Sequence, residues 1–111
     1  MDLVVMVYHI TSAFPKSELF GLISQIRQSA SSIPANISEG AARGTPKEFI
    51  RFLRISSGSL SELDTHIELS YRLNYLDKVT FDDLHEKMKK ISSQLSGLIR
   101  SIEQKSKTNK P

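Results

Sequence analysis

The chain has 111 residues, of which 39% are hydrophobic and 24% are charged, so it is long enough for one domain and too short for two ordinary ones. It contains no cysteine, which excludes disulfide scaffolds, thiolate zinc sites and cysteine nucleophiles. The formal net charge is only +3, so the overall charge is a weak argument for binding to nucleic acid.

The first predicted helix covers residues 2–13, with Asp2 as its N-cap. Its apolar residues recur at intervals of three and four: Leu3, Val7, Ile10 and Phe14. Residues 3–8 are apolar throughout, so this helix needs burial on more than one side. The same run is far shorter than the roughly 20 residues of a transmembrane helix, and it lacks the flanks of a signal peptide. We therefore expect a cytoplasmic protein with no membrane partner.

The second predicted helix covers residues 17–43, with Ser17 as its N-cap. An apolar stripe with intervals of three and four runs along it and passes through Pro34. A proline inside a helix costs roughly 3 kcal/mol or bends the helix. Because the stripe keeps its phase on both sides of Pro34, the simplest interpretation is one kinked helix. A break near residues 31–32 is the alternative.

The third predicted helix covers residues 46–74. Gly44 suits the position just after a helix. It is followed by Thr45 as N-cap, Pro46 as the first helical residue and Glu48 as the third, which together form a capping box. The middle of this helix, residues 56–59, has small side chains and should let another helix approach closely.

The fourth predicted helix covers residues 80–104 and begins with a second capping box, from Thr80 to Asp83. Its apolar residues follow a heptad spacing, and no strand pattern is found anywhere in the chain. Residues 1–104 therefore predict one all-α domain, an up-down-up-down four-helix bundle. Residues 105–111 predict a flexible, lysine-rich tail.

Three stretches carry a resemblance to a known family: residues 32–40, with the sequence SIPANISEG, residues 47–53 and residues 58–63. Together they resemble the bacterial four-helix-bundle proteins encoded in intervening sequences of 23S ribosomal RNA genes, over about residues 3–103. The resemblance implies a subunit that assembles into a homopentameric ring, with a biochemical function unknown for most members. A related protein is the accessory protein of diversity-generating retroelements, a basic pentamer that binds nucleic acid and a reverse transcriptase. This chain lacks the strong positive charge of that protein.

Helix three offers the best basic cluster. At about 100° per residue, Lys47, Arg51 and Arg54 fall within about 60° of one another, and Arg43 lies just before them. This stripe could contact the phosphates of RNA or DNA, or it could be an ordinary solvated helix face. No aromatic residue is interleaved with it, so base stacking is not indicated.

Three polar residues stand out within the matched motifs: Asn36, Glu39 and Glu62. They could form a carboxylate pair for metal or acid–base chemistry, or a hydrogen-bond network that fixes the packing of helices two and three. Di-iron bundles require a Glu-x-x-His motif on paired helices, whereas Glu62 and His66 are four residues apart and have no second copy.

The chain shows no pattern of an enzyme. Its three histidines lie on three predicted helices, and no His-x-x-x-His spacing is present. No Gly-x-Ser-x-Gly elbow, phosphate-binding loop or dinucleotide fingerprint occurs. We therefore predict no catalytic residues, no metal and no cofactor.

Helices one and three carry more apolar residues than one buried face requires. The surplus residues that we expect at a subunit interface are Val4, Tyr8, Ile50, Phe52 and Ile55. A contiguous apolar patch of this kind is rare on monomers, so we expect a closed homo-oligomer; the number five comes from the resemblance. The alternative is that a short first helix leaves part of this surface in water. The leading hypothesis is a non-enzymatic, self-assembling scaffold, and the alternative is a nucleic-acid-binding accessory protein.

Overall fold

A computed structural model describes residues 1–108 of the chain. Helices account for most of these residues, and no strand occurs among them. The elements are α1 (Asp2–Thr11), the short 3₁₀ helix η1 (Lys16–Glu18), α2 (Leu22–Ala42), α3 (Pro46–Arg72) and α4 (Lys78–Thr108). The molecule is elongated and measures 57 × 24 × 18 Å.

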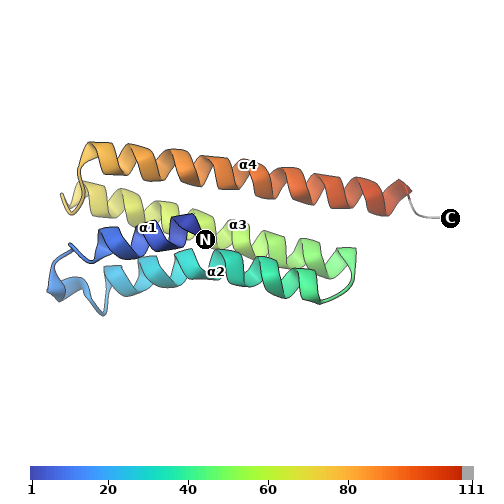
Figure 1. The fold of residues 1–111 in the computed structure, drawn as a ribbon, viewed down its shortest axis with the longest axis horizontal. Helices are drawn as coiled ribbons and strands as arrows, with labels where there is room; N and C mark the ends of the chain where they lie inside the picture. The colour runs from blue at the N-terminus through green and yellow to red at the C-terminus, as the bar shows by residue number, and fades with distance from the viewer. Residues whose placement is uncertain (109–111) are drawn as a thin grey trace.

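Successive helices run antiparallel, as predicted for an up-down-up-down bundle (Figure 1). The third helix is central, because α3 packs against both α2 and α4. The first helix packs against α2, touches α4 and lies diagonally across from α3. With 10 residues, α1 is only about 15 Å long, so it covers one half of the bundle. The all-α fold and the four-helix bundle are confirmed.

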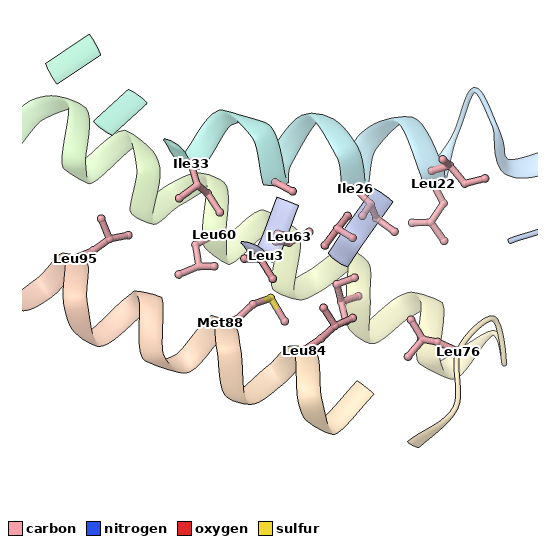
Figure 2. Close-up of a cluster of buried hydrophobic side chains, with 14 of the residues drawn as sticks. Leu3, Leu22, Ile26, Ile33, Leu60, Leu63, Leu76, Leu84, Met88 and Leu95 are labelled. Atoms are coloured by element: carbon pink, nitrogen blue, oxygen red, sulfur yellow. The ribbon is translucent and has the colours of Figure 1, made fainter. Parts of the chain in front are cut away.

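The core lies along the axis between the helices and receives aliphatic side chains from all four of them (Figure 2). Its most deeply buried apolar residues include Val7, Ile26, Ala30, Leu53, Leu63, Ile67 and Leu84. Each such side chain contributes roughly 1.5–3 kcal/mol by leaving water. Most of the apolar stripes predicted for the four helices are buried, but two predicted stripe residues, Leu19 and Leu98, are 47% and 39% exposed, and Ile99 is buried in place of Leu98.

The second helix is continuous through Pro34, so the prediction of a single helix is confirmed and the break near residues 31–32 is not found. Its predicted start was wrong. Ser17 caps no α-helix; it lies in η1, and α2 begins only at Leu22, after Gly21. The reason is that Leu19, the first residue of the predicted stripe, is 47% exposed, so the buried stripe that holds the helix against the core starts only at Leu22.

The turn between α2 and α3 matches the prediction closely. Gly44 adopts a left-handed conformation with φ of +86°, which glycine tolerates and other residues rarely do. The Thr45 hydroxyl accepts a hydrogen bond from the backbone N–H of Glu48 at 3.2 Å, so the N-cap forms. At its other end α3 stops at Arg72, two residues earlier than predicted, and Asn74 turns the chain with φ of +63°.

The predicted start of α4 at Thr80 was also wrong. The helix begins at Lys78, because Asp77 caps it: one carboxylate oxygen accepts a hydrogen bond from the backbone N–H of Thr80 at 2.8 Å. Hydrogen bonds from the backbone and the side chain of Thr80 lower the pKa of Asp77 below its ordinary value. The helix continues to Thr108, beyond the predicted end at 104. Residues 109–111 of the predicted tail lie outside the described residues.

Candidate functional site

A line of short polar side chains joins α2 to α3. The Ser32 and Ser59 hydroxyl oxygens are 2.8 Å apart across the two helices. The Asn36 amide donates to the Ser32 backbone carbonyl at 2.8 Å and to its hydroxyl at 2.9 Å. The buried Ser56 hydroxyl donates to the backbone carbonyl of Ile33 at 2.9 Å. Asn36 therefore helps to hold the seam between two helices and faces no cavity that could take a ligand.

Gly40 allows the closest approach of α2 to α3. A Cβ atom placed on Gly40 would lie 2.6 Å from the Cβ of Phe52 and 3.3 Å from the backbone oxygen of Phe49. Real Cβ atoms do not come this close to other atoms, so only glycine fits without moving the helices apart. Gly40 belongs to the stretch that carries the family resemblance, but nothing in a single helix shows which glycine meets a neighbour.

The two carboxylates of the matched motifs have separate partners. Glu39 pairs with Arg43 at 2.9 Å, whereas Glu62 accepts a hydrogen bond from Ser29 at 3.2 Å and lies 3.8 Å from His66. In the part of the chain that the structure describes, no three His, Cys, Asp or Glu side chains gather where they could hold a metal ion. Of the two, Glu62 joins α3 to α2 through Ser29, whereas Glu39 pairs with Arg43 at the end of α2.

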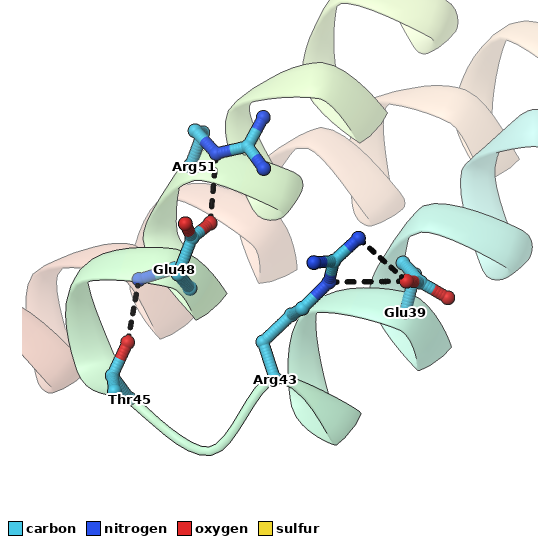
Figure 3. Close-up of polar contacts among 5 residues, drawn as sticks. All are labelled: Glu39, Arg43, Thr45, Glu48 and Arg51. Carbon is cyan, nitrogen blue, oxygen red and sulfur yellow. Dashed lines mark hydrogen bonds and ion pairs between the residues drawn. The ribbon is translucent and has the colours of Figure 1, made fainter.

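Most of the predicted basic stripe is engaged with carboxylates (Figure 3). Arg43 pairs with Glu39 as above, Arg51 pairs with Glu48 at 2.8 Å, and Arg54 lies 3.8 Å from Glu103. Lys47 has no ion-pair partner among the described residues. Three of the four predicted phosphate-binding side chains therefore have their charge partly neutralised within the subunit.

Two of these arginines also cover an aromatic ring. The guanidinium groups of Arg43 and Arg51 lie 5.1 Å and 4.4 Å from the centre of the Phe52 ring, a cation–π contact worth about 0.5–1 kcal/mol at exposed sites. Phe52 itself is only 7% exposed. It packs within its own subunit, so little of its ring is left for the subunit interface at which we expected it.

The fold collects positive charge at one end. The start of α3 and the end of α4 lie at the same end of the bundle (Figure 1). Residues 39–54 carry four basic and two acidic side chains, and residues 100–107 carry three basic and one acidic. This end therefore has a net charge of +4, whereas residues 55–99, with five basic and seven acidic side chains, have −2. The order of charges along the chain does not reveal this basic end, because the two basic segments are far apart in sequence.

A groove runs between α3 and α4 at this basic end. It has a volume of about 280 Å³ and is lined by Pro46, Lys47, Ile50, Glu103, Ser106 and Lys107. It brings Lys107, from the segment predicted as a tail, to the same groove as Lys47. Neither lysine has an ion-pair partner among the described residues.

The predicted interface residues lie on separate faces. On α1, Tyr8 is 43% exposed, whereas the predicted Val4 is half-buried against the core and its neighbour Val5 is 56% exposed. On α3, Ile55 is 40% exposed and lies on the flank that faces α2, in the same helical row as Ser59, which contacts Ser32. Ile50 lies on the other flank, in the groove beside α4. Val5 and Tyr8 thus form an α1 region and Ile55 an α3 region, while Leu19, Phe20, Val79 and Leu98 are exposed apolar residues outside both.

None of the described helices is both long and apolar enough to cross a membrane.

Two histidines lie beside carboxylates, with Nδ1 of His85 3.5 Å from Asp64 and Nε2 of His66 3.8 Å from Glu62. Glu62 and Asp64 are only two residues apart on α3 but lie on different sides of the helix: Glu62 accepts a hydrogen bond from Ser29 of α2, whereas Asp64 faces His85 of α4. His85 and Asp64 line a pocket of about 260 Å³ between α3 and α4, together with Ser57, Ser61, Ser92 and Ser96.

The comparisons agree with this architecture. Residues 1–97 match the family described as 23S rRNA-intervening sequence protein. The solved structure of a protein with unknown function from the S23 ribosomal protein family of Bacteroides thetaiotaomicron is similar, with 25% sequence identity and a TM-score of 0.76. The similarity covers 86% of this chain and 87% of that one. No curated protein matches the chain.

Proposed function

We propose, from the premise that this chain belongs to the family of 23S rRNA-intervening sequence proteins, that it is a non-enzymatic scaffold that assembles with copies of itself. The predicted family membership is confirmed. The function rests on one observation: apolar side chains remain exposed on two helices that lie diagonally across the bundle. Burying such side chains is favourable by roughly 1.5–3 kcal/mol each when burial is complete.

The positions of these residues favour a ring over a two-fold dimer. A two-fold interface uses the same patch on both subunits, whereas a head-to-tail interface joins two different patches and closes into a ring when the rotation allows. Here Val5 and Tyr8 lie on α1, whereas Ile55 lies on α3, a helix that α1 does not contact in the described part of the chain. Contact between the α1 region of one copy and the α3 region of the next buries both, and five copies is the number that the resemblance implies.

Light scattering at micromolar concentration tests the assembly. We expect the wild-type protein to have the mass of an oligomer, and Val5→Glu and Ile55→Glu each to give monomers with unchanged helical circular dichroism. Val79→Glu is the matched control, because Val79 is 79% exposed at the start of α4 and belongs to neither region. A monomeric wild-type protein would contradict the proposal, and so would an oligomer that resists both substitutions.

A second function, binding to RNA or DNA, is supported by the distribution of charge. The net charge of the whole chain is low, but the fold concentrates +4 at one end. In a cyclic ring the equivalent ends of all subunits lie on the same side of the ring, unless the bundles lie flat in its plane. The positive charge of each copy then adds to that of its neighbours on one side, which favours a polyanionic partner.

A further inference from the structure

We infer that the surface that contacts nucleic acid is the groove between α3 and α4 at the basic end, rather than the predicted arginine stripe, and that it binds the phosphate backbone. This inference rests on the second function proposed above and names its contact residues. The groove is lined by Lys47 and Lys107, with the Ser106 hydroxyl, Pro46 and the apolar Ile50 beside them. It also holds one carboxylate, Glu103, which lies 3.8 Å from Arg54.

The first argument is the availability of charge. Affinity for nucleic acid comes mainly from cations that replace the counterions around phosphates. A guanidinium that already pairs with a carboxylate adds little net charge, and Arg43 and Arg51 hold such pairs at 2.9 Å and 2.8 Å. Within the described part of the chain, four cations at this end have no ion-pair partner: Lys47, Arg100, Lys105 and Lys107.

The second argument is structural cost. Arg43 and Arg51 lie over the ring of Phe52, which is packed against Gly40. Turning either guanidinium toward a phosphate would break a salt bridge and uncover that ring. Lys47 and Lys107 have no such contacts and can move toward a phosphate without disturbing the subunit.

The third argument concerns what the surface can read. Sequence-specific binding to single strands relies on exposed aromatic rings that stack on bases. The aromatic residues at this end are Phe49, which is half-buried, and Phe52, which is buried. Besides Glu103, the groove therefore offers two lysines and a hydroxyl for phosphates and no stacking platform, so binding should not depend on base sequence.

The test compares three double substitutions, each of which removes two positive charges. Lys47→Gln with Lys107→Gln changes the groove, and Arg43→Gln with Arg51→Gln changes the predicted stripe. Lys16→Gln with Lys90→Gln removes two cations elsewhere that also lack ion-pair partners among the described residues. The probe is a fluorescently labelled RNA oligonucleotide of mixed sequence, with binding followed by anisotropy across a salt titration. Light scattering and thermal melting of each variant show whether assembly or folding has changed.

We expect the groove variant to bind roughly tenfold more weakly or worse, and its dependence of log affinity on log salt to flatten by about 1.4, since each contact to a single strand contributes about 0.7. The other two variants should remain close to the wild type. Equal losses in all three would overturn the inference, as would a greater loss in the arginine variant than in the groove variant. No binding by the wild type at low salt would instead reject the nucleic-acid function itself. A strong preference for one RNA sequence over another would contradict backbone recognition.

Discussion

At the scale of single residues, the seam between α2 and α3 depends on side chains that are small enough. Gly40 meets Phe52 where a Cβ atom would have no room, and serines fill the positions where hydroxyls bond across the two helices. The motif that carries the family resemblance is therefore explained, at least at Asn36 and Gly40, by helix packing.

Two glycine substitutions separate this packing from helix propensity. Gly40→Ala should destabilise the protein by about 1–3 kcal/mol, because the added methyl forces α2 and α3 apart. Gly58→Ala is the matched control: a Cβ there meets nothing within 4 Å, so it should stabilise α3 by about 0.5–1 kcal/mol. Urea unfolding of both variants measures the difference. If both glycines tolerate alanine equally, the close approach at Gly40 is wrong.

At the scale of secondary-structure elements, helix starts were predicted correctly where the cap and the buried stripe agree. The Thr45 cap stands directly before the first turn of α3, whose Phe49 packs against the core, and was predicted correctly. Ser17 and Thr80 have suitable residue types, but the nearby Gly21 and Asp77 are where the helices begin. A chain with several possible caps uses the one that places its apolar stripe against the core.

The Asp77 cap predicts a dependence of stability on pH. Hydrogen bonds from Thr80 lower the pKa of Asp77 in the folded protein. The ionised carboxylate therefore accepts these hydrogen bonds better than the protonated carboxyl does, and it stabilises the folded protein more. The stabilisation is complete above the ordinary pKa of 3.8 and is lost as the pH falls through the lower, folded value.

Asp77→Ala should therefore lower the melting temperature by a few degrees at neutral pH and by less in strong acid, as measured by circular dichroism. Asp77→Asn keeps a capping oxygen that does not titrate, so it should remove the acid-dependent part of the difference and retain most of the stability. An Asp77→Ala variant that melts like the wild type at neutral pH would show that the cap contributes nothing.

At the scale of the whole molecule, stability is unevenly distributed. The central helix α3 packs on two neighbours and holds fully buried Leu53 and Leu63, whereas the short α1 contacts α2 and only the edge of α4. Local opening is easiest where few apolar contacts are broken. Amide hydrogen exchange, followed by mass spectrometry, should be slowest in the middle of α3 and faster in α1. If α1 is protected in the wild-type protein and loses that protection in the Val5→Glu variant, assembly through this helix is further supported. If α1 exchanges more slowly than α3 in a monomer, α3 is not the stable centre of the subunit.

The sequence by itself determined the helical periodicity, the four helices, the core stripes and the cap at Thr45. These features depend on residues within a few positions of one another, where 3.6-residue spacing and capping chemistry act. Only the tertiary structure decided that Gly40 is a contact point, that Phe52 is buried beneath two arginines, and that Lys47 and Lys107 share a groove. It also brought two modestly charged segments together into one basic end. These properties arise because antiparallel packing makes neighbours of residues about 60 positions apart, such as Lys47 and Lys107, and no local pattern records that proximity.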